Sequence, residues 1–433
     1  MIEVIVNRPS FEYDIHSLVK SFFPREDVQI HVQDTFSEDT ALRISVEFTD
    51  ETVSICLMEQ GEEKESGASV INYAERKETK NRLKRQLYQL LCTYTGQTLP
   101  WGTLTGIRPA KIAMGLIEQG MSNVETAEYM RNTYLASKEK VALSVMIANR
   151  ERYVLRNIDY KDGYSLYVGI PFCPSICLYC SFSSYPLERW RKQVDQYLDA
   201  LCKELDYVAD RFRDKKLNTV YIGGGTPTTL EPYQLDRLLT RIQRKFDTEY
   251  LQEFTVEAGR PDSITREKLQ VLLDHGIDRI SINPQTMNQK TLEIIGRRHT
   301  VDQVKEAFAL ARSMGFAHIN MDLIVGLPGE SYDDVEHTMK ELEAMAPDSV
   351  TVHSLAIKRA ARLSLFKDKY EEMGLENNMQ IMDMTARYCA EMGLSPYYLY
   401  RQKNMAGNFE NVGYAQPEKA GIYNILIMEE KQT

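Results

Sequence analysis

The feature that most constrains this 433-residue chain is a regular alternation of apolar strands and helices along its middle. Six short apolar segments are typical of buried strands, at 165–170, 217–225, 253–259, 279–285, 318–328 and 349–357. The helical patterns between them include 195–212, 232–246, 301–315 and 332–346. Repeated strand–helix units imply a parallel sheet. Six units predict an α/β fold, an open and partial (β/α)6 TIM-type barrel, with functional groups at the carboxyl ends of the strands.

The flanking segments predict two further parts. Residues 1–155 are expected to form an α+β domain, residues 160–370 the barrel, and residues 371–433 a C-terminal extension. In the first part, strand-like patterns occur at 3–8, 28–34, 42–48 and 52–59, and an amphipathic helix is expected at 75–93. The extension begins with a helical pattern at 378–393 and ends in a strand-like run at 423–430. The chain stops at Thr433 without a clear finishing element, which leaves a truncated terminus open.

Composition narrows the class of protein. The net charge of −10 gives no basic footprint, so nucleic acid is not expected as a partner. No apolar stretch approaches the ~20 residues of a membrane span, and the N-terminus lacks a signal-peptide pattern. Seven cysteines without a secretory signal fit a reducing compartment. The expectation is a soluble cytoplasmic protein.

Three of the seven cysteines, Cys173, Cys177 and Cys180, share one short run, YVGIPFCPSICLYCSF. The Pro and Ser among them favour a loop. Three buried structural thiols are the simple alternative; a zinc site would show a second Cys or His pair, and a disulfide framework would not have a sparse, odd number. Three thiols at these spacings can instead bind three irons of a [4Fe–4S] cluster. Fully ligated clusters use four thiolates, so one iron would stay open to a ligand.

Other polar or glycine positions fall near the ends of the predicted strands. A glycine run at 223–225, followed by Thr-Pro-Thr, ends the second strand and would let the backbone approach a ligand closely. Glu257 ends the third strand, where a carboxylate can accept hydrogen bonds from ribose hydroxyls. Gln285 follows the fourth, Asp322 lies within the fifth, and Arg297 can pair with a ligand carboxylate. Each is compatible with a structural role. Together they are expected at one mouth of one barrel.

These motifs carry a resemblance to a known family. The segments YVGIPFCPSICLYC, GGGTPT and INMDLIVGLPGE resemble the radical S-adenosylmethionine (SAM) superfamily. Within it, residues 165–430 resemble the oxygen-independent coproporphyrinogen III oxidase group. The segments LTGIRPAKI and YRQKNMAGNFENVGYAQP resemble the HemZ-type coproporphyrinogen dehydrogenases, so that the likeness extends over the whole chain.

The resemblance implies roles for particular residues. Cys173, Cys177 and Cys180 would hold the cluster, and its open iron would bind the amino and carboxylate groups of SAM. The positions that match contacts of this SAM are Tyr167, Gly224 and Glu257. The group is described with a second SAM, so one or two molecules are expected. The positions that match its contacts are Tyr179, Gly225, Thr226, Gln285, Arg297, Asp322 and Ala356.

The implied activity is oxidative decarboxylation in haem biosynthesis. One-electron reduction would cleave SAM to methionine and a 5′-deoxyadenosyl radical, which would take hydrogen from the β-carbon of a propionate. Loss of CO2 and one electron, twice per molecule, would convert coproporphyrinogen III to protoporphyrinogen IX. The expected partners are the porphyrinogen substrate and a low-potential one-electron donor of the flavodoxin or ferredoxin type. The alternative is a haem-binding or haem-trafficking protein of the same family without this turnover.

The sequence departs from better-known members in three places. Gly169 stands where they carry a His, and Tyr179 where they carry a Phe. Decarboxylating members often have a further Cys two residues after the triplet, where this chain has Phe182 preceded by Ser181. The haem-chaperone branch carries an HNxxYW motif in its later region, and nothing like it occurs in the comparable segment RQKNMAGNFENVGYA.

Overall fold

The computed structural model describes residues 1–24, 26–32, 40, 42–358, 360–365, 373–402 and 409–432. The chain divides into two compact units, Met1–Ala148 and Asn149–Thr433. Residues 33 and 34 of one expected strand, residues 403–408 of the tail motif and Thr433 lie outside the described residues. In the part of the chain that is described, no helix is long and apolar enough to cross a membrane.

The first unit contains a five-stranded sheet in the order β2-β1-β3-β4-β5. Its strands are β1 (Ile2–Val6), β2 (Val28–Val32), β3 (Leu42–Phe48), β4 (Thr52–Glu59) and β5 (Glu62–Val70). Strand β1 runs parallel to both of its neighbours, whereas β3, β4 and β5 form an antiparallel meander. Each of the four expected strand segments overlaps a strand.

Helices complete the first unit. The helices α1 (Glu12–Phe22) and α2 (Arg76–Thr95) join the sheet in one apolar core, in which Ile15, Leu18, Leu83 and Leu87 are fully buried. Their spacing of three or four residues puts each pair on one helical face. The unit continues through η1 (Tyr73–Glu75), α3 (Pro109–Glu118), α4 (Asn123–Tyr134) and α5 (Lys138–Leu155), the last of which extends past the boundary between the units.

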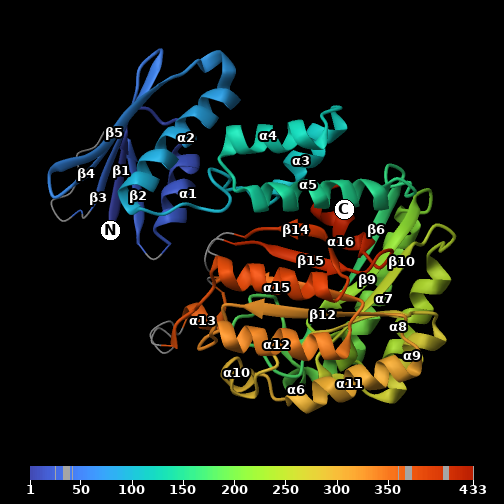
Figure 1. The fold of residues 1–433 in the computed structure, drawn as a ribbon. Coiled ribbons are helices and arrows are strands. Elements are labelled where there is room, and N and C mark those ends of the chain that lie inside the picture. Colours follow the sequence, from blue (N-terminus) through green and yellow to red (C-terminus); the bar gives the residue numbers. More distant parts are fainter. Residues whose placement is uncertain are drawn as a thin grey trace. The chain divides into compact units, whose positions relative to one another are not determined.

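The second unit is built on a curled eight-stranded sheet in the order β14-β15-β13-β12-β11-β10-β9-β6 (Figure 1). Six strands are parallel: β6 (Gly163–Ile170), β9 (Lys216–Gly224), β10 (Glu253–Gly259), β11 (Arg279–Ile282), β12 (His318–Val325) and β13 (Ser349–Ser354). They correspond to the six expected strands, so the partial barrel is confirmed. Two further strands from the C-terminal segment, β14 (Ser395–Tyr400) and β15 (Asn411–Ala415), extend the sheet: β15 pairs antiparallel with β13, and β14 pairs antiparallel with β15.

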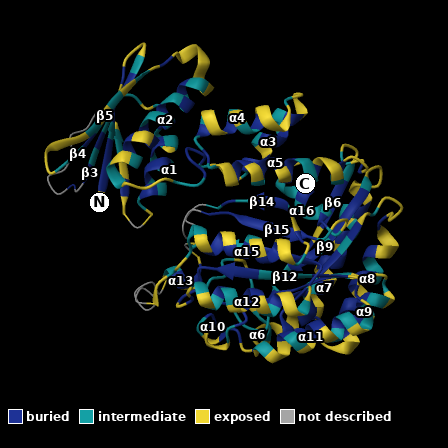
Figure 2. Cartoon of the chain, viewed as in Figure 1, coloured by how far each residue is buried: buried dark blue, intermediate teal, exposed yellow. Residues whose placement is uncertain are grey.

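Amphipathic helices follow the parallel strands and cover the outer face of the sheet (Figure 1). They are α7 (Val194–Arg211), α8 (Pro232–Lys245), α9 (Arg266–Asp274), α11 (Val301–Met314), α12 (Tyr332–Met345) and α15 (Met379–Glu391). Helix α8 shows why: Leu235, Leu238, Leu239 and Ile242 are fully buried and lie on one helical face. The strands are buried and the outward helix faces exposed, as Figure 2 shows. Shorter elements are α6 (Leu187–Trp190), α10 (Gln289–Ile294), α13 (Arg362–Leu365) and the 3-10 turns Arg191–Gln193, Pro227–Thr229 and Pro261–Ser263.

The strand expected at 423–430 is wrong, because this segment forms helix α16 (Ile422–Met428). The adjacent residues Ile425 and Leu426 are both fully buried, in one apolar cluster with Tyr397 and Tyr398 of β14. A strand would send two adjacent side chains to opposite faces, whereas a helix can bury both with Ile422 on one side. Burial of these side chains in the apolar cluster therefore favours a helix over a strand in this segment.

Candidate active site

The three cysteines lie on a loop at the carboxyl edge of the parallel sheet. The loop leaves β6, and its ends are joined where β7 (Phe172–Cys173) pairs with β8 (Tyr185–Pro186). Leu178, in its middle, is 4% exposed and packs in an apolar cluster with Ile295 and Ile324. Its backbone N–H donates to Ile295 O at 2.9 Å, and its carbonyl accepts from Leu363 N at 2.9 Å. Packing and backbone hydrogen bonds thus fix the course of the loop.

All three loop cysteines are free thiols, and Cys177 is buried. Burial raises the pKa of Cys173 and Cys180 above the ordinary thiol value, and the neighbouring cysteines contribute to both shifts. Among the described residues, no three His, Cys, Asp or Glu side chains are arranged to hold one metal ion. A cubane does not require that convergence, because each thiolate binds a different iron.

The glycine run at the end of β9 lies against the cysteine loop. Gly225 N donates to Ile170 O at 2.7 Å, and Thr226 N donates to Phe172 O at 2.8 Å. A Cβ on Gly225 would lie 2.6 Å from Phe172 O and 3.0 Å from Cys173 Sγ. The Thr226 hydroxyl donates to Cys173 Sγ at 3.6 Å. The close approach of the two segments therefore requires glycine at position 225, and the expected residues Gly225 and Thr226 adjoin the first cysteine.

Glu257 lies near the end of β10 and accepts a hydrogen bond from the Tyr221 hydroxyl at 2.6 Å. The Tyr221 ring stacks on Tyr423 of α16 at 4.6 Å between centroids and on Tyr167 of β6 at 6.1 Å. Burial raises the pKa of Glu257 to about 7; the Tyr221 hydrogen bond opposes this shift and the charge of Asp322 adds to it. Tyr167 and Glu257, both expected at the first SAM, therefore border one aromatic group, and Gly224 ends the adjacent strand β9.

Gln285 holds a strained backbone next to β12. It is 8% exposed, and its φ of 70° lies in the left-handed region. Its N–H donates to Asp322 O at 3.0 Å, and its carbonyl accepts from Ile324 N at 2.9 Å. Its buried side-chain oxygen Oε1 has no hydrogen-bond partner within the described ranges. Such strain costs of order 1–3 kcal/mol and gathers at ligand sites.

Two charged side chains, those of Arg297 and Asp322, belong to the same part of the candidate site as Gln285. Arg297 is 6% exposed and donates to Tyr179 OH at 3.3 Å and to Asn283 O. Asp322 accepts from Asn320 Nδ2 at 2.7 Å and lies 3.8 Å from His353 Nε2. Burial would raise the pKa of Asp322, but the His353 and Asn320 interactions lower it below the ordinary value, so this group is a carboxylate.

The expected residues thus lie in small contacting groups at one edge of the sheet: Cys173 with Gly225 and Thr226, Tyr179 with Arg297, and Gln285 with Asp322. Ala356 is half-buried and follows the end of β13 by two residues. Gly169, one departure from the family pattern, has open space beside it, because among the described residues an added Cβ would meet only the Tyr167 ring, at 3.5 Å.

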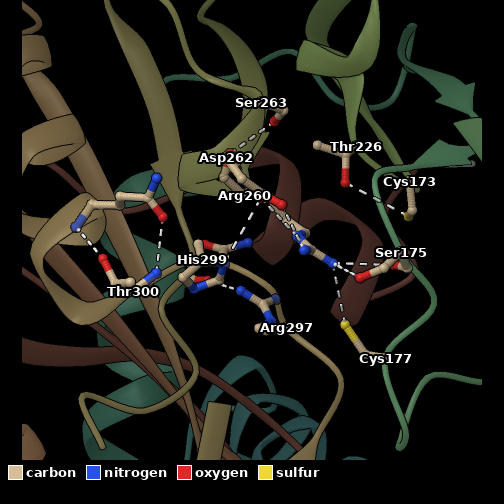
Figure 3. Close-up of polar contacts among 12 residues, drawn as sticks. Cys173, Ser175, Cys177, Thr226, Arg260, Asp262, Ser263, Arg297, His299 and Thr300 are labelled. Carbon is tan, nitrogen blue, oxygen red and sulfur yellow. Dashed lines mark hydrogen bonds and ion pairs between the residues drawn. The ribbon is translucent and has the colours of Figure 1, made fainter. Parts of the chain in front are cut away.

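Sequence reasoning missed an ion pair beside the cysteine loop, between the buried Arg260 and Asp262, with the buried His299 close to Asp262 (Figure 3). Arg260 is 3% exposed and donates to Ser175 O at 3.1 Å and Ser175 Oγ at 2.8 Å. Arg260 immediately follows the third parallel strand. Its position could have been noticed from the sequence, because functional groups in barrels gather at the carboxyl ends of the strands.

The residues present fit a thiolate-bound cluster with a polar ligand beside it. Glycine at 225 provides close backbone approach to Cys173. Gln285 Oε1 and Arg297 Nε are buried side-chain atoms left without hydrogen-bond partners in the part of the chain that is described. Leaving such atoms unpaired costs about 1–3 kcal/mol each, and a polar ligand would recover that cost.

Comparisons with known proteins agree with this geometry. The sequence model of the Radical SAM superfamily matches residues 167–342. The oxygen-independent coproporphyrinogen-III oxidase-like protein HemZ of Bacillus subtilis is 44% identical over 361 residues, which are 82% of this chain and 72% of that protein. The heme chaperone HemW of Lactococcus lactis is 36% identical over 52% of this chain and 59% of its own length. The solved structure of coproporphyrinogen III oxidase (HemN) from Escherichia coli has a TM-score of 0.51 and 25% identity, covering 62% of this chain and 59% of that one.

The half-barrel and its three-cysteine loop define a radical SAM protein, a class that uses a [4Fe–4S] cluster and SAM. Within that class, the chain belongs to the family of oxygen-independent coproporphyrinogen-III oxidase-like proteins that includes HemZ.

We predict that Gly225→Ala displaces the cysteine loop. The added methyl group meets Phe172 O and Cys173 Sγ, and overpacking of this kind costs about 1–3 kcal/mol. Iron and sulfide content after anaerobic reconstitution should fall, together with the free energy of unfolding in urea. Gly106→Ala is the control, since an added Cβ there has no described atom within 4 Å. Equal iron content in both variants would contradict the close approach.

A second prediction concerns the pH dependence of stability. The pKa of Glu257 is about 7 in the fold against an ordinary 4.5, so its neutral form favours folding at low pH, and this contribution is lost as pH rises through 7. Glu257→Gln keeps an acceptor for Tyr221 without the charge. The free energy of unfolding of this variant minus that of wild type should increase between pH 4.5 and pH 8. The increase should be on the order of 3 kcal/mol, because each unit of pKa difference corresponds to 1.36 kcal/mol. Urea titrations at both pH values check this, with exposed Glu343→Gln as control; a difference independent of pH would refute the shift.

Proposed function

We propose that this protein is a radical SAM oxidoreductase of haem biosynthesis that converts two propionates of coproporphyrinogen III to vinyl groups, giving protoporphyrinogen IX. The observation that carries the proposal is its 44% identity, over 82% of the chain, to a protein named as oxygen-independent coproporphyrinogen-III oxidase-like. Each propionate that reacts gives one hydrogen atom to the SAM-derived radical, releases CO2 and passes one electron to a one-electron acceptor, which balances its conversion to a vinyl group. A low-potential donor of the flavodoxin or ferredoxin type supplies the electrons for cluster reduction.

Cofactor binding is proposed residue by residue. Cys173, Cys177 and Cys180 hold the cluster, and Tyr167, Gly224 and Glu257 contact the first SAM. A second SAM is assigned to a larger set: Tyr179, Gly225, Thr226, Gln285, Arg297, Asp322 and Ala356. When bound, the cluster and SAM supply the one-electron chemistry that removes hydrogen from the substrate.

The chain's own residues bind and orient these groups. Arg297 is a buried guanidinium with one unpartnered N–H among the described residues, suited to a ligand carboxylate. Glu257 offers a carboxylate oxygen to ribose hydroxyls, and its ionised form is the acceptor. The stacked rings of Tyr167, Tyr221 and Tyr423 provide an apolar border. The protein thus contributes orientation and exclusion of water, while the cofactor carries the difficult chemistry.

The activity is tested with anaerobically reconstituted protein and coproporphyrinogen III. We expect protoporphyrinogen IX together with 5′-deoxyadenosine, and Cys177→Ala should abolish both products because one cluster ligand is lost. Cys202→Ala is the matched control, since Cys202 is another buried cysteine, on helix α7. Bound cluster and SAM without decarboxylation would refute the substrate, whereas SAM cleavage by Cys177→Ala would refute the cluster assignment.

A second candidate function is haem binding or trafficking without this turnover. The similarity to heme chaperone HemW proteins, at 36% identity in Lactococcus lactis and 38% in Bacillus subtilis, favours it. These matches cover 52% and 45% of this chain, less than the match to HemZ.

Haem titration separates the two candidates. If the protein is an oxidase, titration followed by absorbance should give no stoichiometric haem complex, and coproporphyrinogen III should be consumed. Stoichiometric haem binding that coproporphyrinogen III does not displace, without product, would establish the second candidate instead.

A further inference from the structure

Arg260 is a buried cation that connects the end of β10 to the cysteine loop (Figure 3). Its Nε and Nη2 donate to the two carboxylate oxygens of Asp262 at 3.0 and 2.8 Å. This bidentate geometry fixes the plane of the guanidinium group. His299 Nδ1 lies 3.8 Å from Asp262 Oδ1. Asp262, in the turn that directly follows β10, therefore holds one edge of the guanidinium group in place.

The remaining nitrogen of Arg260 faces the cysteine loop. Nη1 donates to Ser175 O at 3.1 Å, to Ser175 Oγ at 2.8 Å and to Cys177 Sγ at 3.9 Å. The Ser175 hydroxyl in turn donates to Gly296 O at 2.8 Å. Arg260 thus holds the loop between the first and second cysteines and brings positive charge to the second sulfur.

The position of this charge has an electrostatic consequence for a cluster at Cys177. Hydrogen bonds to the sulfurs and local net charge help to set the reduction potential of iron–sulfur clusters. Reduction adds one negative charge, so a buried cation beside the sulfur favours the reduced form. Asp262 binds the opposite edge of the guanidinium group and partly offsets this effect.

We propose that Arg260 is a positioning residue that holds the cysteine loop through Ser175 and raises the reduction potential of the cluster through Cys177. This role rests on the assignment of the cluster to the three cysteines, but not on the identity of the substrate. It differs from the ligand-binding role given to Arg297.

The first experiment measures the potential of the cluster in full-length, anaerobically reconstituted protein. Iron and sulfide are quantified, and the midpoint potential is then determined by EPR-monitored redox titration. Arg260→Met should shift the potential to more negative values, and Asp262→Asn should shift it to more positive values, because each removes a charge of opposite sign. Arg266→Met, which removes an exposed arginine from the start of α9, should leave the potential unchanged.

Opposite shifts distinguish electrostatics from a loosened fold, which would move both variants in one direction. Two shifts of the same sign, or no shift, overturn the proposal. If Arg260→Met binds no iron, the test rests on Asp262→Asn alone. In that case a midpoint potential of Asp262→Asn that equals or lies below the wild-type value overturns the proposal. Wild-type protein that binds no iron refutes the cluster and this role together, whereas failure to decarboxylate refutes only the substrate.

The second experiment tests the loop contact without a cluster. In cluster-free protein, backbone hydrogen exchange of the loop at 173–180 is followed by mass spectrometry, with folding verified by circular dichroism. The loop in Arg260→Met should exchange about tenfold faster, since a hydrogen bond to a charged group is worth at least that factor. Arg260→Lys, which keeps the charge, should retain a midpoint potential close to wild type. Equal exchange rates of this loop in wild type and Arg260→Met overturn the loop contact.

Discussion

The site depends on the close approach of two backbones, the loop that leaves β6 and the glycine run that ends β9. Adjacent parallel strands bring these exits to the same edge of the sheet. Backbone hydrogen bonds from Gly225 and Thr226 to the cysteine loop then hold them together, with no room for a side chain at position 225. Cys173 and the candidate site residues Gly225 and Thr226 lie together because of that one contact.

Much of the fold was predictable because hydrophobic periodicity reports burial. The six parallel strands and the helices that cover them have the alternation expected of buried strands and amphipathic helices. Strand β5 was not predicted because Glu62–Val70 has few apolar residues, and its pairing with β4 stabilises it. Helix α1 was not predicted because Phe11 precedes it without a side-chain cap. Helix α16 was predicted as a strand because its adjacent buried residues acquire their helical role only against β14.

The location of candidate site residues was predictable where it follows from position along a strand. Glu257 and Asp322 were found because carboxylates near the ends of apolar strands are conspicuous. Arg260 was not, because its partner Ser175 lies 85 residues earlier and nothing local marks the arginine as buried. Tyr221 was missed for a similar reason: its hydrogen bond to Glu257 joins two strands, and a tyrosine in a strand is ordinary in sequence.

The backbone of Gln285 shows a cost that is built into this half-barrel. Glycine would adopt its left-handed conformation freely, yet the position holds a side chain whose oxygen finds no partner among the described residues. Both the conformation and the unpaired oxygen lower the stability of the protein without a ligand. A ligand that formed a hydrogen bond with Gln285 would therefore also stabilise the sheet around it, which would link binding to unfolding thermodynamically.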